Sequence, residues 1–515
     1  MTSATRTSET DPLRIAELRA GRGLVGVTLC PGKQGHSAYG GSWARSMEAD
    51  LAAIVDWGAS AVVTLIEEHE FGLLGVEALP RAVQAAGIEW HWLPIPDVDV
   101  PDGRFSARWV YAGARVRERL RSGERVLVHC RGGLGRAGMV AAGILVEFGM
   151  PPREAIAAVR RVRPGAIETA AQEAWVGQRQ PLAAERDERR SRELACLLGG
   201  AIGDALGYRV EFQRWAEIKR AYGSAGIGLA QAEGELVVSD DTQMTLFTLE
   251  GMTRAGGLGE ITGEINEAYL DWYGTQRRVS GARAVRGRLA GRAELCRSRA
   301  PGGTCLAALR EGGHGSVTQA INGSKGCGGV MRTAPLGFLD DAVSDGDVFR
   351  LGAEAAALTH GHPDGFLPAG AVPVLVRDAL NGVAWDASIE KVLALTRAWP
   401  KSQGTAAAIE AAWESSSEAP SRERVNALGE GWVGEEALAI GLYSALTAGS
   451  FAECVELAAN HDGDSDSTAS IAGQLYGAKH GLGSPPAEAV YRLDVLEALL
   501  EVVGEWGRAR QIAKL

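Results

Sequence analysis

The sequence predicts a multidomain protein in which an α/β domain is followed by an all-α domain. The chain has 515 residues, which is more than one hydrophobic core ordinarily serves. Its first part alternates strand-like and helix-like segments, as layered α/β folds do. After a charged segment at residues 179–192, helical periodicity continues to the end with almost no strand signals. We therefore expect domains at residues 1–178 and 193–515, with the charged segment between them as a linker or solvated helix.

In the first domain we expect buried strands and amphipathic helices in alternation. Met47, Leu51, Ile54 and Val55 recur at helical spacing, and Pro152 suits the first turn of a helix. The expected strands lie at residues 24–29, 61–66 and 126–128, and the expected helices at 43–57, 107–120, 139–148 and 152–162.

The composition excludes several classes of protein. Hydrophobic residues make up 46% and charged residues 23% of the chain, as in soluble globular proteins. The net charge of −11 argues against general nucleic-acid binding. The 7 cysteines are scattered without CxxC spacing, which predicts a reducing compartment. With no signal-peptide pattern and no apolar run of ~20 residues, we expect a cytoplasmic protein that does not bind membranes. The oligomeric state is not predicted.

A strand, a glycine loop and a helix follow one another around Cys130. Gly132, Gly133 and Gly135 allow backbone N–H groups to turn inward, and the helix directs its positive end at the same point. A Cys130 thiolate is stabilised there, and Arg136 can clamp phosphoryl oxygens. This spacing predicts cysteine-dependent cleavage of phosphate esters.

The leaving oxygen of such a reaction needs a general acid. Asp97 lies on a loop after a strand-like segment and is the first candidate, with Asp99 and Asp102 as rivals.

The Cys130–Arg136 motif, the Asp97 loop and the run Arg-Pro-Gly-Ala-Ile-Glu-Thr at residues 163–169 resemble the cysteine-dependent dual-specificity phosphatases, and within them the kinase-associated (cyclin-dependent kinase inhibitor 3-like) branch. The resemblance covers residues 20–178. It implies Cys130 as nucleophile, Arg136 as phosphate binder, Asp97 as general acid, and no cofactor. Ala137 departs from the pattern, since the family usually has a hydroxyl residue there that assists expulsion of the thiolate. Slow turnover is therefore expected, and a phosphate-binding module without turnover is the alternative.

Two pairs of carboxylates open apolar helices in the second domain. Each pair is flanked by hydroxyl residues, and the set forms an oxygen-only cage suited to hard cations such as Mg²⁺. Helix capping alone would need one such residue at each start. The residues of the cage are Ser239, Asp240, Asp241, Asp464, Asp466 and Ser467.

Other motifs of this domain are less specific. Gly199, Gly203 and Gly207 form a smooth stripe for close helix packing, and Asp204 would share a helix face with Glu211 if the helix continues. The loop at residues 322–332 either cradles a diphosphate or is merely flexible. The pair of histidines at 360 and 362 has no third soft ligand for zinc nearby, so His360 is interpreted as a pocket residue or a structural histidine.

Taken in their order along the chain, these motifs resemble the ADP-ribosylglycohydrolase family over residues 190–512. The resemblance implies an all-α fold with two Mg²⁺ ions bridged by Asp466. It also implies Asp241 as a possible base for water and Glu211 as a mobile gate acid. The implied metal ligands are Ser239, Asp240, Asp241, Asp464, Asp466 and Ser467, and the implied substrate contacts are Gly323, Ser324, Lys325 and His360.

The sequence thus predicts a bifunctional hydrolase acting on phosphorylated and ADP-ribosylated substrates. One hypothesis is that both sites act on a single ADP-ribosyl product that also bears a phosphate. The alternatives are that one or both halves bind these groups without turnover, or that the first half docks kinases. The acceptor of the ADP-ribose, whether arginine, serine, a nucleic-acid end or a small molecule, is not predicted.

Overall fold

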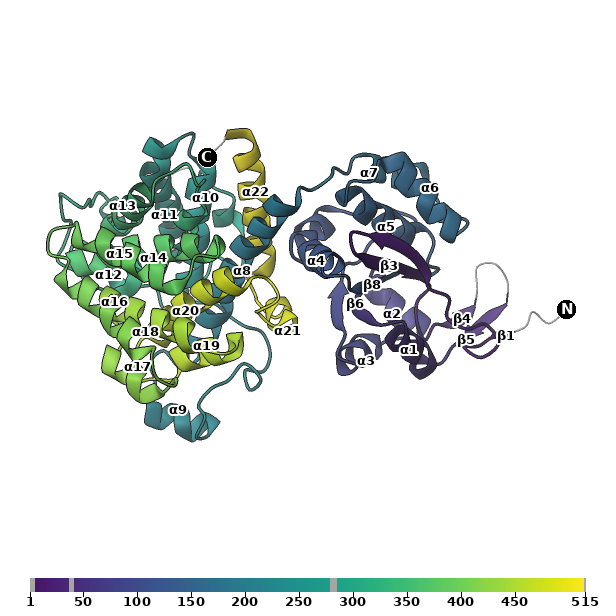
Figure 1. Cartoon of the computed structure of the whole chain (residues 1–515), viewed down its shortest axis with the longest axis horizontal. Helices are drawn as coiled ribbons and strands as arrows, with labels where there is room; N and C mark the ends of the chain where they lie inside the picture. Colours follow the sequence, from purple (N-terminus) through teal and green to yellow (C-terminus); the bar gives the residue numbers. More distant parts are fainter. Residues whose placement is uncertain (1–4, 37–40, 278–284, 514–515) are drawn as a thin grey trace. The chain divides into compact units, whose positions relative to one another are not determined.

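The computed structural model describes residues 5–36, 41–277 and 285–513 (Figure 1). The chain divides into two compact units, Met1–Glu188 and Arg189–Leu515. The division falls inside helix α8 (Ala184–Gly207), so the second half of the predicted charged linker is helical. No helix among the described residues is long and apolar enough to cross a membrane.

The first unit is built on a five-stranded sheet of order β2-β3-β8-β6-β7, in which only β2 is antiparallel to its neighbour. A second, three-stranded sheet has the order β1-β5-β4. The strands of the larger sheet are β2 (Ala16–Ala20), β3 (Gly23–Thr28), β8 (Arg125–His129), β6 (Ala59–Thr64) and β7 (Glu89–Trp92), and those of the smaller are β1 (Thr5–Arg6), β5 (Ser42–Ala44) and β4 (Gln34–His36).

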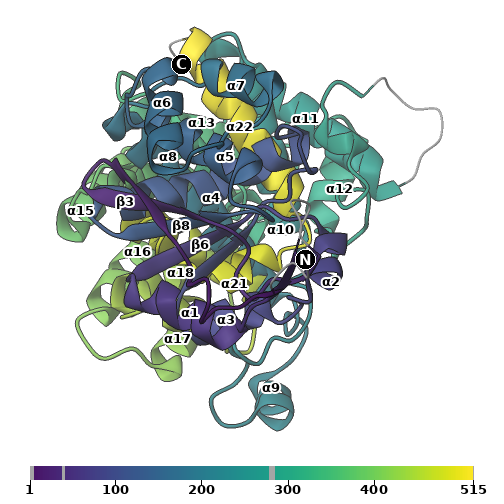
Figure 2. The same ribbon diagram turned by 90° about the vertical axis from the view of Figure 1, so that its right-hand side faces the viewer.

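Helices cover both faces of the larger sheet, as Figure 2 shows for strands β3, β8 and β6. One core joins Val27, Val63 and Val128 to α4 and α5, and the other joins Val62 and Leu127 to α1, α2 and α3. The alternation of side chains along each strand sends successive residues to opposite cores. The helices are α1 (Met47–Asp56), α2 (Glu68–Leu74), α3 (Leu79–Ala85), α4 (Gly103–Arg121), α5 (Gly135–Glu147), α6 (Pro152–Val162) and α7 (Ala170–Gly177).

One predicted helix of this unit begins later than expected. The prediction placed it at residues 43–57, but Trp43 lies in strand β5 and the helix starts at Met47. Ser46 has extended backbone angles and caps the helix by accepting a hydrogen bond from the N–H of Ala49. The remaining predicted strands and helices of the unit are present, with ends that differ by a few residues, and Pro152 opens α6 as expected.

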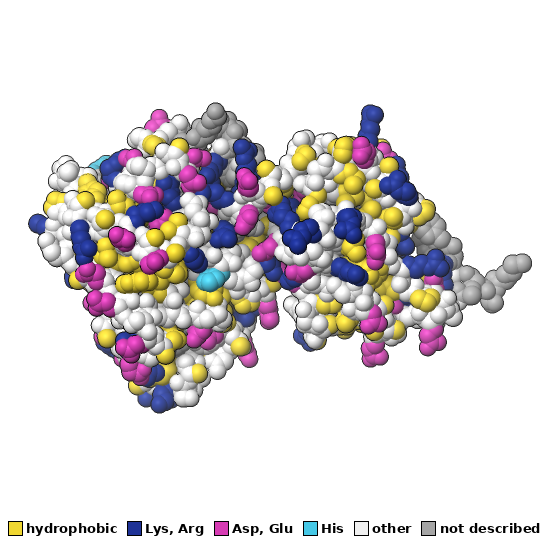
Figure 3. All heavy atoms as spheres, viewed as in Figure 1, with side chains coloured by type: hydrophobic (Ala, Val, Ile, Leu, Met, Phe, Trp, Pro, Cys, Tyr) yellow, Lys and Arg dark blue, Asp and Glu magenta, His cyan; other side chains and the backbone are white. Residues whose placement is uncertain are grey.

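The second unit is helical, and its only β pairing among the described residues is two isolated bridges. Its face in Figure 3 carries basic and acidic side chains interspersed. The α-helices after α8 are α9 (Trp215–Tyr222), α10 (Asp240–Arg254), α11 (Ile261–Arg277), α12 (Gly303–Arg310), α13 (Asp345–Ala357), α14 (Pro363–Leu380), α15 (Trp385–Arg397), α16 (Gln403–Ser415), α17 (Arg422–Leu428), α18 (Gly434–Thr447), α19 (Phe451–Ala459), α20 (Ser465–His480), α21 (Ala487–Tyr491) and α22 (Leu496–Ala513). The 3₁₀ turns are η1 (Leu258–Glu260), η2 (Leu289–Gly291), η3 (Cys327–Gly329) and η4 (Ala334–Phe338).

The glycine stripe predicted on α8 is a packing surface for α20. A methyl group added at Gly199, Gly203 or Gly207 would overlap a backbone carbonyl oxygen of the α20 segment. Because only hydrogen atoms fit there, α8 and the start of α20 lie in backbone contact. This close approach brings Asp204 to the segment that carries Asp466.

The helix that carries Asp204 does not continue to Glu211, as a shared helix face would require. It ends at Gly207, and Glu211 lies in the turn that follows. The tight contact of Gly207 with the backbone of Ser465 and Asp466 accompanies this end of the helix.

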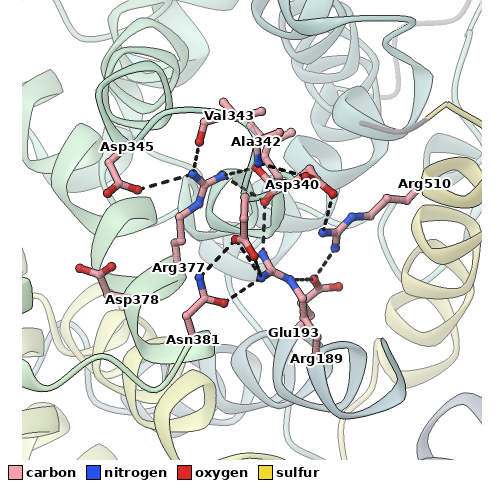
Figure 4. Close-up of polar contacts among 12 residues, drawn as sticks. Arg189, Glu193, Asp340, Ala342, Val343, Asp345, Arg377, Asp378, Asn381 and Arg510 are labelled. Carbon is pink, nitrogen blue, oxygen red and sulfur yellow. Dashed lines mark hydrogen bonds and ion pairs between the residues drawn. The ribbon is translucent and has the colours of Figure 1, made fainter. Parts of the chain in front are cut away.

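Arginine side chains join several segments of the second unit through backbone oxygens and carboxylates (Figure 4). Arg377 of α14 donates to the backbone oxygens of Val343 and Leu339, at 2.5 and 3.0 Å. Arg510 of α22 pairs with Glu193 of α8 at 2.7 Å. The first contact joins α14 to the segment that precedes α13, and the second joins α22 to α8.

Candidate active sites

Cys130 lies at the carboxyl end of β8, where the chain turns into α5. Its side chain is 3% exposed, and the N–H of Gly133 donates to its Sγ at 3.3 Å. Gly133 has φ +68°, and an added Cβ would overlap the backbone of Thr28, so only glycine fits. The loop therefore holds a sulfur atom at a helix N-terminus with at least one N–H donor directed at it, an arrangement that stabilises a thiolate.

Arg136, in the first turn of α5, is held by two carboxylates, Glu70 of α2 and Asp97 of the loop after β7. It forms a bidentate pair with Glu70, with Nη1 to Oε2 at 2.6 Å and Nη2 to Oε1 at 2.9 Å, and Nη2 lies 2.9 Å from Asp97 Oδ1. Burial alone would raise the pKa of Glu70, but the hydrogen bonds from Arg136 hold it below its usual value. The guanidinium is thus fixed in orientation before any phosphate arrives.

Only one of the three candidate general acids lines the cavity of Cys130. This cavity is about 540 Å³ and includes Asp97, Cys130 and Arg136 in its wall. Asp99 accepts a hydrogen bond from the N–H of Val100, and Asp102 caps α4 through the N–H of Phe105. The geometry therefore favours Asp97 over its rivals as the group near the reacting atoms.

Five buried carboxylates meet at the second cavity, which is about 320 Å³. Oxygen atoms of Glu211, Asp464 and Asp466 lie within 4.8 Å of one another, and Asp240 and Asp241 line the same cavity. No basic side chain pairs with any of the five among the described residues, so their charges are uncompensated within the unit.

The helix starts hold the two aspartate pairs as the sequence predicts. Ser239 caps α10 by accepting from the N–H of Asp241 at 3.2 Å, and Asp464 caps α20 by accepting from the N–H of Ser467 at 3.4 Å. Asp466 Oδ1 also accepts from the N–H of Ser467, at 3.0 Å. Ser239 is fully buried behind the aspartates and does not line the cavity, whereas Ser467 does.

Asp204 is a positioning residue for the first pair. Its Oδ1 accepts from the N–H of Ser239 at 2.9 Å, and its Oδ2 accepts from both the N–H and the hydroxyl of Thr242. The sequence showed Asp204 within a motif but gave no signal for this role, because the contact joins residues far apart in the chain.

The carboxylates of this cluster carry like charges that repel one another. Burial raises the pKa of Asp241 well above its usual value, and the carboxylates of Asp466 and Asp204 raise it further. Burial, followed by the charge of Asp466, likewise raises the pKa of Glu211. Asp241 Oδ2 and Glu211 Oε2 are buried without a hydrogen-bond partner among the described residues. An all-oxygen site with unpartnered atoms fits a hard divalent cation.

The glycine-rich loop reaches the cavity with its second half only. Gly326, Cys327 and Gly328 line the cavity, whereas the predicted contacts Gly323, Ser324 and Lys325 do not. Ser324 Oγ lies 3.1 Å from Thr304 Oγ1, and Lys325 Nζ pairs with Glu435 at 2.6 Å. Cys327 lies beside the carboxylates, and its Sγ donates to Asp464 Oδ2 at 2.6 Å.

His360 is a buried residue of the cavity wall, and burial lowers its pKa to about 3. The ring is therefore neutral, and its Nδ1 lies 2.8 Å from the hydroxyl of Thr359. His362 has a different role, because it caps α14 by accepting from the N–H of Asp364. At the mouth of the cavity, the rings of Phe212 and Trp432 lie 6.3 Å apart and nearly parallel.

Comparisons with known proteins divide the chain in the same way. The family model of ADP-ribosylglycohydrolase matches residues 185–512, more than half of the chain. The model of the Swiss Army Knife protein, DSP-PTPase phosphatase domain, matches residues 40–176.

Individual relatives match each half separately. ADP-ribosyl-[dinitrogen reductase] glycohydrolase of Rhodospirillum rubrum is 25% identical over 336 residues, which are 61% of this chain and 97% of that protein. Cyclin-dependent kinase inhibitor 3 of Rattus norvegicus is 32% identical over 128 residues, or 24% of this chain, which spans 59% of that protein's length. A solved ADP-ribosylglycohydrolase-related protein complex is 26% identical, covers 62% of this chain and 99% of its own, and has a TM-score of 0.43.

Proposed function

Because the chain belongs to the ADP-ribosylglycohydrolase family and carries a phosphatase domain of the dual-specificity type, we propose that it is a bifunctional hydrolase. Its second unit cleaves the glycosidic bond of an ADP-ribosylated acceptor with Mg²⁺, and its first unit hydrolyses a phosphate monoester through Cys130. The observation that carries the proposal is that the buried carboxylates of Glu211, Asp464 and Asp466 meet at one cavity without a basic partner among the described residues.

In this proposal Ser239, Asp240, Asp241, Asp464, Asp466 and Ser467 would hold two Mg²⁺ ions, and Asp466 would contribute to the binding of both. When bound, such ions supply an acidified water and a fixed position for the ribose hydroxyls. The cavity wall contributes neutral His360, which can hydrogen-bond the distal ribose but cannot repel the ions. Gly323, Ser324 and Lys325 face the diphosphate in this proposal, although the cavity is lined by the residues that follow them.

Asp241 is proposed as the acceptor of the attacking water's proton. Asp241 lines the cavity, and its Oδ2 is buried without a hydrogen-bond partner among the described residues. Glu211 lies in a turn rather than in a helix, which suits a gate at the cavity mouth. The bond to the acceptor then breaks through an oxocarbenium-like state, as in other glycoside hydrolysis.

In the first unit, Cys130 Sγ attacks phosphorus while the loop N–H groups and Arg136 hold the phosphoryl oxygens. Asp97 protonates the leaving oxygen, and water then hydrolyses the phosphocysteine. Gly132, Gly133 and Gly135 contribute backbone N–H groups that donate to the phosphoryl oxygens in this proposal. The domain boundaries proposed for these activities are 1–178 and 193–515.

Two assays on the intact chain test the proposal. Release of ADP-ribose from an ADP-ribosylated arginine, serine, nucleic-acid or small-molecule acceptor is expected to stop with EDTA and to return with Mg²⁺. Hydrolysis of p-nitrophenyl phosphate is expected to continue with EDTA and to stop in Cys130→Ser. ADP-ribose release that persists in EDTA would contradict the metal site, and phosphate release by Cys130→Ser would contradict the nucleophile.

A phosphate-binding role is the second candidate for the first unit, and Ala137 favours it. This residue is fully buried in α5 directly after Arg136 and offers no hydroxyl to the thiolate. A burst of p-nitrophenol equal to the enzyme concentration, followed by almost no further release, would establish a trap rather than an enzyme.

A further inference from the structure

The cavity at Cys130 holds more basic side chains than one phosphate group requires. A single phosphate is served by the loop N–H groups and Arg136. The wall also contains Arg6, Arg14, Lys33, Arg45, Arg131 and Arg163, against only three acidic residues, Asp11, Asp97 and Glu168. At about 540 Å³, the cavity has the size of a site for a whole small molecule.

Three of the basic groups already have carboxylate partners in the protein, and one of them is Arg131, whose Nη1 lies 4.0 Å from Asp97 Oδ2. Arg136 pairs with Glu70 and Asp97, and Arg45 forms a bidentate pair with Asp50, with its Nε at 2.7 Å and its Nη2 at 2.8 Å from the carboxylate oxygens. These pairs position the wall but leave little positive charge for a second anion.

Lys33 is different, because it is a buried cation without an acidic partner. Lys33 is 7% exposed, and its Nζ donates to the backbone oxygen of Arg131 at 3.1 Å. No carboxylate lies within ion-pair distance of it in the part of the chain that the structure describes. An ammonium group that is removed from water in this way is stabilised by an anion in the cavity.

Arg163 and Arg14 extend the same positive region. Arg163 donates to the backbone oxygens of Gly133 and Gly132, at 3.0 and 3.2 Å, so it is fixed against the loop of Cys130. Arg14 is exposed, and no ion pair joins it to another described residue. Burial lowers the pKa of Arg163, and the charge of Arg14 lowers it further, so the two guanidinium groups act on each other.

The small sheet contributes side chains to the wall of the cavity. Arg6 of β1, His36 of β4 and Trp43 of β5 all line it. Lys33 Nζ lies 5.0 Å from the centre of the Trp43 ring, and Arg6 lies 4.3 Å from it. Such a bounded hollow suits a small molecule better than a side chain on a folded protein surface.

We propose that the substrate of the first unit is a small molecule that carries two phosphate groups, one at Cys130 and one on Lys33, Arg14 and Arg163. This inference rests on the proposed phosphatase function and names its substrate class. The S–P bond forms at the first phosphate as the ester P–O bond breaks, and the leaving oxygen takes its proton from Asp97. Water then cleaves the S–P bond, which gives inorganic phosphate and the thiolate, and the second phosphate is unchanged.

The test compares matched substrates on the intact chain. The pairs are adenosine 3′,5′-bisphosphate with adenosine 5′-monophosphate, and fructose 1,6-bisphosphate with fructose 6-phosphate. In at least one pair, kcat/KM for the bisphosphate is expected to exceed that for the monophosphate by about tenfold or more. Lys33→Gln and Arg14→Gln are each expected to lower this ratio, whereas Arg81→Gln, at an exposed position of α3, is not. Arg14 is exposed, so its variant answers the question even if Lys33→Gln does not fold.

A third arm identifies the source of the second phosphate. Phosphatidylinositol 4,5-bisphosphate in vesicles is compared with soluble inositol 1,4,5-trisphosphate, and where the matched pairs support two phosphates, the faster of these two substrates assigns them to a lipid or to a free molecule. Ratios near one in every pair, or ratios that the two variants leave unchanged, would overturn the inference although p-nitrophenyl phosphate is still hydrolysed. A phosphopeptide that outperforms every bisphosphate would also overturn it.

If no phosphate ester is turned over, the phosphatase function fails and binding decides the inference. Calorimetry on Cys130→Ser is then expected to show the bisphosphate binding about tenfold more tightly than the monophosphate. Equal affinities would overturn the inference.

Discussion

The two candidate sites balance charge in opposite ways. At the first, Arg136 is already paired with Glu70 and Asp97, and the helix N-terminus stabilises the sulfur of Cys130. At the second, five buried carboxylates meet with no basic partner among the described residues. The charges of the first site are therefore largely balanced within the protein, whereas we propose that those of the second are balanced by bound cations. The predictions below test this contrast.

Exchange of the general acid is expected to have the largest effect at the first site. Asp97→Asn should lower kcat/KM for phenyl phosphate, a monoester with a poor leaving group, by about 10²–10⁴-fold, because the leaving oxygen loses its proton donor. The loss should be greatest with the poorest leaving group, as measured by initial rates across phenyl phosphates.

Asp99→Asn is the matched control, since Asp99 hydrogen-bonds the N–H of Val100 and does not line the cavity. A larger loss in Asp99→Asn than in Asp97→Asn would reassign the acid.

Loss of Asp466 is expected to weaken both ions together. Asp466→Asn should lower Mg²⁺ affinity and ADP-ribose release by at least the ~10–100-fold typical of losing a partner of a metal site. Titration calorimetry with Mg²⁺ gives the affinity directly. Asp386→Asn, at an exposed position of α15, is the control. Unchanged Mg²⁺ affinity in Asp466→Asn would contradict the shared ligand.

Metal-free protein is expected to lose stability as pH rises. Burial and neighbouring carboxylates raise the pKa of Glu211, Asp240 and Asp241 in the folded state. The folded chain then binds more protons than the unfolded chain above about pH 4, so the free energy of unfolding falls from there upward. Thermal unfolding in EDTA from pH 5 to 8 measures this slope.

Mg²⁺ should remove that dependence by stabilising the ionised form, and Asp466→Asn should reduce it without metal. A melting temperature in EDTA that rises over the same range would show that the carboxylates are compensated by something other than cations.

The smallest expected effect lies at position 137. Ala137→Ser should raise steady-state turnover by about tenfold, because a hydroxyl beside Cys130 assists release of the thiolate. The first burst of product should keep its rate, since the first chemical step does not use this group. Stopped-flow measurement of p-nitrophenol separates the two phases, and an accelerated burst with unchanged steady state would contradict the assignment.

Local sequence patterns predicted most of the helices and strands of the first unit, and they nominated the central residues of both candidate sites. The strand–loop–helix around Cys130 and the aspartates at the starts of α10 and α20 are encoded within short segments, where capping and glycine geometry decide the backbone. The glycine stripe likewise predicted the close packing of α8, although not its partner. Spacing alone could not show that α8 ends at Gly207 or that Trp43 lies in a strand, because both depend on contacts with distant backbone.

The sequence by itself determined the two domain classes through the periodicity of their hydrophobic residues. It also determined the Cys130–Arg136 loop and the paired carboxylates, because each of these motifs lies within a short segment. Only the tertiary structure decided which charges are compensated. In the folded chain Glu70 pairs with Arg136, Asp204 accepts from the N–H of Ser239 at the start of α10, and Glu435 pairs with Lys325. Lys33 and the carboxylates of the second cavity have no partner of opposite charge among the described residues. Each of these pairs joins residues that are distant in the chain, so no local pattern could specify them.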